Sequence, residues 1–313
     1  MLKHTAILLA GFAALMLSAE EDPMAAIESH AKEATKVQYR NKKRITEGTE
    51  KVPMKCRDTY VFKSTAGEQL IYYTRYLNQP PQFIGKHSSL GPEMGIGFGG
   101  RSFSNWYGND CIRVMVDGQD IMQKTPATVS HREDDAGHLT MVWDMKNNRS
   151  LTLDFYVFPE NDRIYVRGIL KLPGVSVENV QVRLNGYPGG FGPAYNIPSE
   201  RYFSADCNVS GKAFAKAEKK TFKTNLDPKG KWIFLADKLQ KKGSIALLFD
   251  PNEAGEFKLS HSYYGSTLTL NYPGDVRTFY LALYAYEIEN DLAFANFKAR
   301  IDKDFKEMHE IKY

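Results

Sequence analysis

Two segments of this sequence combine aromatic rings with glycine, proline and planar polar side chains. The first, 77–110, contains the run Gly95-Ile96-Gly97-Phe98-Gly99-Gly100, and the second is 185–206. A pyranose has an apolar face that stacks on aromatic rings and hydroxyls that pair with amides, carboxylates and guanidinium groups. We therefore predict that these segments contact a polysaccharide or an oligosaccharide. The alternative is that the rings pack each loop on its own sheet. The predicted substrate-binding residues are Trp106, Tyr107, Asn185, Tyr187 and Tyr195.

The residues available for catalysis are few. If the protein is an enzyme, we expect a carbohydrate epimerase, a polysaccharide lyase or a glycoside hydrolase. His261 or Glu200 would be the acid or base, and Arg101 or Arg201 would neutralise a substrate charge or a developing charge. His261 lies within an apparent strand, so the alternative is a histidine whose hydrogen bonds are satisfied inside a sheet. The distance between two carboxylates depends on the fold, so spacing does not choose between the reactions.

Motifs for metals, nucleotides and nucleophiles are weak or absent. The segment 131–138 holds two histidines and three carboxylates, but it lies where a hairpin turn is expected. Consecutive carboxylates on a turn usually face water, so we predict no metal site. The glycine-rich run near residue 97 has no βαβ pattern around it and no Lys-Ser or Lys-Thr pair after it, so we predict no bound cofactor. Neither GxSxG nor HExxH occurs.

From about residue 57 the hydrophobic pattern is that of strands. Leu139–Met145 and Leu151–Val157 alternate between apolar and polar residues, and Asn147-Asn148 between them is a turn signal. Asp117-Gly118 is the strongest hairpin signal. Many short strands separated by Gly and Pro turns predict an all-β, mainly antiparallel fold, a large β-sandwich domain over 53–288. The motifs identify no family. In general shape this architecture resembles the supersandwich folds of sugar epimerases and polysaccharide lyases, a likeness of fold class alone.

Helices are expected at both ends of the sandwich. An N-terminal helical segment is predicted over 20–52, with a helix over 22–44 that Asp22 can cap and that ends in the basic run Arg40–Arg44. A basic run is commonly a solvated helix end, and a contact with an acidic polymer is the alternative. A C-terminal amphipathic helix is predicted over 289–313, packed on the sandwich. Its apolar stripe consists of Phe294, Phe297, Ile301, Phe305 and Met308.

The first nineteen residues predict export. Lys3, an apolar run that ends at Leu17, and Ala19 before three acidic residues are typical of a signal peptide over 1–19 cut after Ala19. We therefore expect a secreted or periplasmic protein, with no stable membrane span after cleavage. Three cysteines (Cys56, Cys111 and Cys207) permit one disulfide bond or three separate buried thiols.

Charge limits the possible partners. Loss of Lys3 with the signal peptide leaves 40 basic and 37 acidic residues, a net charge of +3. This balance does not favour nucleic acid. The oligomeric state stays open. The alternative to a carbohydrate-binding or carbohydrate-processing protein is a non-catalytic structural or protein-interaction protein of the cell envelope. Its contact elements would be the terminal helices and Arg40–Arg44.

Overall fold

A computed structural model of the chain describes the residues from the first strand to the C-terminus, with gaps. The described residues are 37–46, 54–78, 93–98, 104–108, 110–122, 126–133, 136–145, 147–190, 198–206, 210, 214–215, 221–251, 256–262 and 264–313. The predicted signal peptide, 1–19, lies outside them. No helix among them is both long enough and apolar enough to cross a membrane.

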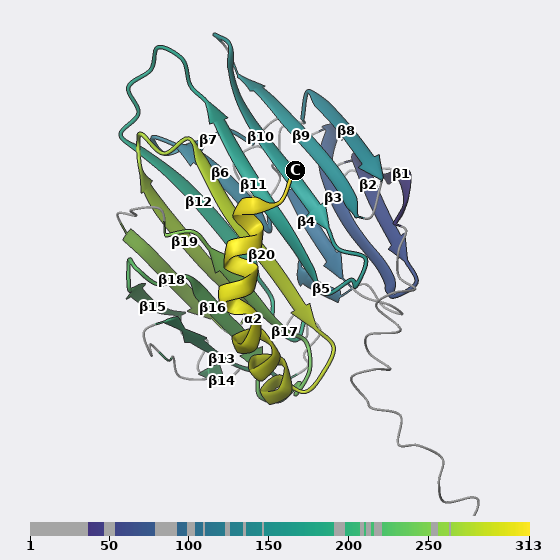
Figure 1. The fold of residues 1–313 in the computed structure, drawn as a ribbon, viewed down its shortest axis with the longest axis vertical. Coiled ribbons are helices and arrows are strands. Elements are labelled where there is room, and N and C mark those ends of the chain that lie inside the picture. The colour runs from purple at the N-terminus through teal and green to yellow at the C-terminus, as the bar shows by residue number, and fades with distance from the viewer. Residues whose placement is uncertain are drawn as a thin grey trace, which may run out of the picture.

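Antiparallel strands form three sheets, which confirms the predicted fold class (Figure 1). The largest sheet has nine strands in the order β14-β13-β16-β17-β20-β11-β10-β9-β8. Their bounds are β8 (Thr128–Glu133), β9 (Gly137–Met145), β10 (Arg149–Val157), β11 (Arg163–Lys171), β13 (Glu200–Ala205), β14 (Phe214–Ala215), β16 (Trp232–Asp237), β17 (Ser244–Phe249) and β20 (Thr278–Tyr286).

Two smaller sheets pack on one face of the nine-stranded sheet. The six-stranded sheet, in the order β15-β18-β19-β12-β6-β7, consists of β6 (Ile112–Val116), β7 (Gln119–Asp120), β12 (Asn179–Gly186), β15 (Thr221–Leu226), β18 (Glu256–Ser262) and β19 (Ser266–Pro273). The five-stranded sheet, in the order β1-β2-β3-β4-β5, consists of β1 (Gln38–Thr46), β2 (Met54–Ser64), β3 (Gly67–Asn78), β4 (Glu93–Phe98) and β5 (Ser104–Tyr107). One hydrophobic cluster, which includes Ile96, Leu153 and Val182, joins all three sheets.

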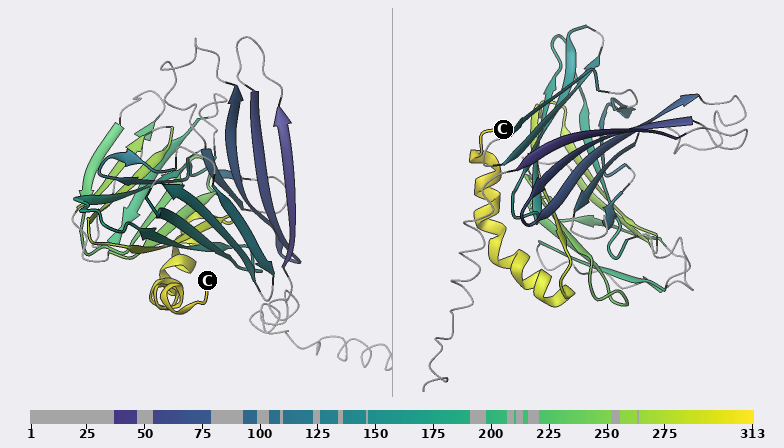
Figure 2. Two further views of the ribbon diagram at one scale, coloured as in Figure 1. Left: turned by 90° about the horizontal axis from the view of Figure 1, so that it is seen from above. Right: turned by 90° about the vertical axis from the view of Figure 1, so that its right-hand side faces the viewer.

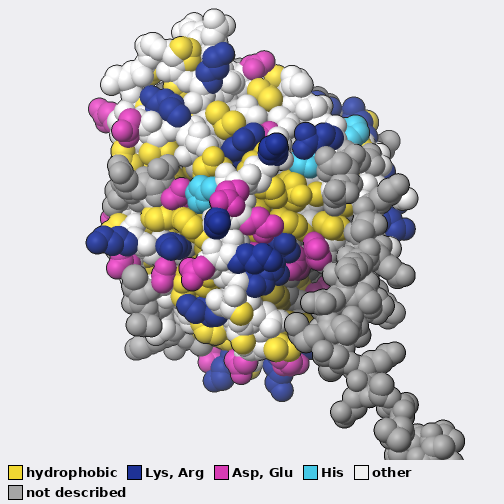
Figure 3. All heavy atoms as spheres, viewed as in Figure 1, with side chains coloured by type: hydrophobic (Ala, Val, Ile, Leu, Met, Phe, Trp, Pro, Cys, Tyr) yellow, Lys and Arg dark blue, Asp and Glu magenta, His cyan; other side chains and the backbone are white. Residues whose placement is uncertain are grey.

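The helix α2 (Asn290–Glu310) covers the opposite face of the nine-stranded sheet (Figure 2). Its buried residues Phe297, Ile301 and Met308 belong to a second hydrophobic cluster with residues of β16, β17 and β20. The apolar stripe of this helix is therefore used for core packing. Charged side chains of both signs are interspersed on the face of the molecule that carries α2 (Figure 3).

The predicted helix over 22–44 is wrong where the structure describes that range. Residues 38–46 form β1, which pairs with β2 along its whole length, from Gln38 opposite Lys63 to Thr46 opposite Lys55. The Tyr39 ring of β1 stacks on the His131 ring, with 3.7 Å between the ring centroids. The basic run is therefore part of an edge strand, because pairing with a partner far away in sequence outweighs local helix propensity. The rest of the predicted helix lies outside the described residues.

The segment 77–110, predicted as a loop, contains two strands. The apolar residues Met94, Ile96 and Phe98 face the core from β4, and Gly95 and Gly97 alternate with them. A Cβ atom on Gly95 would lie 2.1 Å from the Tyr72 ring of β3, and one on Gly97 would lie 2.9 Å from Leu70. These glycines are thus needed where large side chains of a neighbouring strand lie across the backbone.

Turn residues were correctly identified from the sequence. Asp117 and Gly118 have φ of 48° and 76° between β6 and β7, and Asn147 and Asn148 have φ of 64° and 58° between β9 and β10. Two successive left-handed residues match the twist of antiparallel strands, which is why Asn, Asp and Gly are preferred there.

Candidate functional site

Ionisable side chains gather where the five-stranded and six-stranded sheets meet. We call this group the junction site and define it as Glu93, Asp110, Arg113 and Tyr187. Glu93 begins β4, Asp110 lies just before β6, Arg113 is in β6, and Tyr187 follows the last residue of β12.

Backbone hydrogen bonds hold these segments together. The Cys111 N–H donates to the Met94 carbonyl at 2.9 Å. Asp110 and Glu93 are close enough for the charge of Asp110 to act on the Glu93 carboxyl group. The Tyr187 N–H donates to the Trp106 carbonyl at 2.7 Å. The segments 77–110 and 185–206, which both contain predicted sugar-binding residues, therefore contact each other.

Asp110 is fixed by its surroundings. Its φ of 59° is left-handed, a conformation that costs energy for a residue other than glycine and is enriched at functional sites. The Arg113 Nε and Nη2 groups donate to Asp110 Oδ1 at 3.0 and 2.5 Å. Asn185, one of the predicted substrate-binding residues, donates from Nδ2 to the Asp110 carbonyl at 2.8 Å and accepts from Thr267 Oγ1 at 2.7 Å. Asn185 therefore positions this loop.

Glu93 is the most unusual carboxyl group of the site, being only 8% exposed. Burial, followed by the negative charge of Asp110, raises its pKa from 4.5 to about 7, while Arg57 and Lys55 oppose the rise. Burial also raises the pKa of Asp110, against the effect of the Arg113 guanidinium. A carboxyl group with a pKa near neutrality can give and take a proton under physiological conditions.

Tyr187 borders these carboxyl groups with a half-buried ring. The ring lies against Gly265, where a Cβ atom would be 2.8 Å from Cε1. Burial and the charge of Asp110 raise the pKa of Tyr187, and Arg201 opposes the rise. The phenol therefore stays protonated at neutral pH and is a hydrogen-bond donor at the edge of the site.

The two predicted ring residues of β5 are in the core. Trp106 is 9% exposed, and its indole packs on Gly243, where a Cβ atom would lie 2.9 Å from Nε1. Tyr107 is 1% exposed, and its hydroxyl group bridges the carbonyls of Ala246 and Tyr284 at 2.8 and 2.9 Å. These positions match the alternative to sugar binding, in which the rings pack the segment on its own sheet.

Two predicted catalytic residues, Arg201 and His261, are also inaccessible, each at 0% exposure. Arg201 donates to the Gly190 carbonyl at 2.6 Å, and its Nε lies 3.9 Å from Asp237 Oδ2. His261 Nδ1 is 2.5 Å from Ser266 Oγ, and its ring packs on Phe203. Burial lowers the pKa of His261 to about 4, so the imidazole is neutral at pH 7. Both side chains therefore lie inside the sandwich and contact other groups of the protein.

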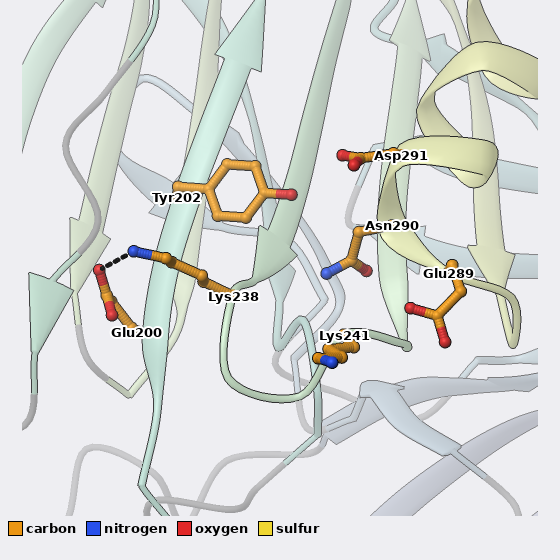
Figure 4. A pocket seen from close by; sticks show the side chains of 7 residues that line it. All are labelled: Glu200, Tyr202, Lys238, Lys241, Glu289, Asn290 and Asp291. Atoms are coloured by element: carbon orange, nitrogen blue, oxygen red, sulfur yellow. Dashed lines mark ion pairs between the residues drawn. The ribbon is translucent and has the colours of Figure 1, made fainter.

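Glu200 lies on the other face of the nine-stranded sheet from Arg201, because consecutive strand residues point in opposite directions. It lines a pocket of about 560 Å³ at the start of α2, shown in Figure 4. The Lys238 ammonium lies 3.5 Å from Glu200 Oε1. The other lining residues are Tyr202, Lys241, Glu289, Asn290 and Asp291. The structure therefore does not bring Glu200, Arg201 and His261 to one cleft.

The remaining predictions are partly outside the described residues. Arg101 and Tyr195 lie there, as does Cys207. Cys56 and Cys111 are buried free thiols. Within the described ranges, no cluster of three or more His, Cys, Asp or Glu side chains could hold a metal ion.

Glu93, Asp110 and Arg113 are not among the site residues predicted from the sequence. A signal for Glu93 was present, because Met94, Ile96 and Phe98 alternate with period two and predict a strand that Glu93 begins. The intervening glycines are typical of a loop, which is the prediction for the segment 77–110. No local pattern shows that this strand ends beside Asp110, since that contact depends on how two sheets meet.

No protein-family model matches the sequence, and no curated protein is similar to it. Among solved structures, one similar chain is from Klebsiella pneumoniae and is described as an aldose 1-epimerase. It is 9% identical with a TM-score of 0.49, over 88% of this chain and 90% of that chain. An α-N-acetylgalactosaminidase from Bifidobacterium bifidum is 7% identical with a TM-score of 0.44, over 83% of this chain and 39% of that chain. An α-galactosidase from Geobacillus stearothermophilus is 8% identical with a TM-score of 0.37, over 79% of this chain and 41% of that chain. Likeness at this level carries no conclusion about the function of this chain.

Proposed function

We propose that this protein binds carbohydrate at the junction site and uses Glu93 as an acid–base group on it. The observation that carries the proposal is that the buried carboxyl group of Glu93 and the partly buried carboxyl group of Asp110 lie near each other, beside the half-buried ring of Tyr187. Planar carboxyl groups match the hydroxyls of a sugar, and an aromatic ring matches its apolar face.

The two carboxyl groups have different surroundings and so would have different roles. Asp110 is fixed by Arg113 and is suited to hold a sugar hydroxyl. Among the described residues, none donates a hydrogen bond to the Glu93 carboxyl group, which leaves it available to exchange a proton with a substrate. Glu93 would donate its proton to a sugar oxygen or accept one from a sugar hydroxyl, in either case moving one proton and no electrons.

A panel of neutral and acidic oligosaccharides, followed by calorimetry for binding and by NMR for turnover, tests this function. Glu93→Gln keeps the shape of the side chain and removes its titration. The matched control is Glu200→Gln, a carboxyl group in a pocket on the other face of the nine-stranded sheet. We expect wild-type protein to bind at least one saccharide class and Glu93→Gln alone to lose turnover. Absence of binding across the panel, or equal effects of the two substitutions, would contradict the proposal.

We also propose that the protein is exported, because an extracellular or periplasmic protein would encounter polysaccharide. The expected mature N-terminus is Glu20, which mass spectrometry of the protein recovered from its native host would show. A recovered chain that retains residues 1–19 would contradict export.

A further inference from the structure

The outer face of the five-stranded sheet carries a line of polar residues that runs to the junction site. Arg44 of β1 is opposite Arg57 of β2, Arg57 is opposite Thr74 of β3, and Thr74 is opposite Glu93 of β4. Directly opposite residues point to the same face of a sheet. The four residues therefore form one row, which we call the Arg44–Glu93 row.

A groove of about 430 Å³ lies over the first half of this row. Its cations are Lys42, Arg44, Lys55 and Arg57, and its apolar residues are Val61 and Leu70, both buried. Thr46 and Thr59 complete the lining. The groove thus has an aliphatic base and a positively charged rim.

Most of this positive charge is not neutralised by residues that the structure describes. Lys42, Arg44 and Lys55 form no ion pair with any residue that the structure describes, whereas Arg40 on the same face pairs with Glu68 at 2.5 Å. Arg44 and Arg57 are directly opposite each other, an arrangement of like charges that destabilises a strand pair. A bound anion between them would remove that repulsion.

Protection of an exposed sheet edge does not account for the pattern. Charged side chains on an edge strand prevent pairing with other molecules, and β1 is an edge strand. However, Lys55 and Arg57 belong to β2, which is paired on both sides. Arg57 is also held in place, since its Nε donates to Thr74 Oγ1 at 2.9 Å and its guanidinium carbon lies 4.2 Å from the centre of the Tyr72 ring.

We infer that the groove binds the anionic groups of an acidic polysaccharide at the open end of the Arg44–Glu93 row, whose other end is Glu93. This inference rests on the proposed function, since it assigns the substrate class of the same site. Carboxylate or sulfate groups of the polymer would contact the rim, and sugar C–H groups would cover Val61 and Leu70.

Nucleic acid fits this surface less well. Proteins that bind single strands stack bases on exposed aromatic rings, and none of the described residues that line the groove is aromatic. The Tyr72 ring is 7% exposed and lies under Arg57.

Binding of three polysaccharide probes that differ in charge tests the inference. Polygalacturonate, its fully methyl-esterified form and heparin separate carboxylate, neutral and sulfate groups, and poly(dT) tests nucleic acid. The test variant combines Lys42→Gln, Arg44→Gln and Lys55→Gln. A control with the same loss of charge combines Lys43→Gln in β1 with Lys303→Gln and Lys306→Gln on α2, all three exposed.

We expect wild-type protein to prefer polygalacturonate or heparin over the methyl ester, with an affinity that falls as salt is added. The groove variant should lose about tenfold in affinity for the acidic probe, and the control should keep wild-type affinity. Equal binding of acid and ester, unchanged binding by the groove variant, or a preference for poly(dT) would overturn the inference. If the ester binds and Glu93→Gln still abolishes turnover, only this inference fails; if no polysaccharide binds, the proposed function fails with it.

Discussion

Glu93 lies directly opposite Thr74 in the β3–β4 ladder. Glu93 is buried there, although a glutamate carboxyl group is usually exposed. Thr74 is 1% exposed and accepts a hydrogen bond from Arg57, so a cation is within reach of this carboxyl group without pairing with it directly.

The stability of the protein should depend on pH through Glu93. The pKa of Glu93 is about 7 in the folded chain, whereas the ordinary value for a glutamate side chain is 4.5. The folded state therefore favours the protonated form. The stabilisation is complete below pH 4.5 and is lost as the pH rises through 7. Relative to Glu93→Gln, wild-type protein should lose up to about 3 kcal/mol between pH 4 and pH 8. Urea unfolding at several pH values measures this difference, and parallel curves would show that Glu93 titrates normally.

His261 should produce the opposite dependence. Its pKa is lowered from 6.5 to about 4, so the folded state favours neutral imidazole. The stabilisation is present above pH 6.5 and is lost as the pH falls through 4, by up to about 3 kcal/mol. His261→Gln should remove this loss while turnover stays at the wild-type level, because the ring is 0% exposed. Loss of turnover in a folded His261→Gln protein would instead indicate a catalytic role for His261.

Tyr107 should affect stability and leave sugar binding unchanged. Its buried hydroxyl group bridges the carbonyls of Ala246 and Tyr284. Tyr107→Phe should lower the free energy of unfolding by about 1–2 kcal/mol, since buried carbonyls lose a donor. Tyr187→Phe serves as the comparison, and it should weaken saccharide binding because its phenol borders Glu93 and Asp110. Calorimetry and thermal unfolding of both variants distinguish the two roles, and weaker saccharide binding by Tyr107→Phe would contradict this assignment.

Packing of α2 on the nine-stranded sheet should contribute substantially to stability. Phe297 is 0% exposed and contacts the rings of Trp232 and Tyr284. Phe297→Ala should cost about 3–5 kcal/mol, because it leaves a cavity against the sheet. Leu292→Ala on the same helix is the control, as Leu292 is 55% exposed and should change stability by less than about 0.5 kcal/mol. Similar losses for both variants would contradict the assignment of the stability of α2 to the packing of Phe297.

Local features of the sequence were sufficient to predict the fold class, the turns and the last helix. The 3.6-residue period of Phe297, Ile301 and Met308 is visible in the sequence, and so is the tolerance of Asn147, Asn148 and Gly118 for positive φ. Each of these depends on neighbours in the chain, which is why the sequence alone determines them.

Tertiary structure decided the site. Whether 38–46 is helix or strand depends on β2, and whether Gly95 belongs to a loop or a strand depends on Tyr72 in β3. The approach of Glu93 to Asp110 depends on how the sheets meet, and so does the choice of Arg201 over Glu200 as the residue that faces the interior. Burial raises the pKa of Glu93 only once those sheets have packed, because desolvation is a property of the assembled surroundings and not of sequence spacing.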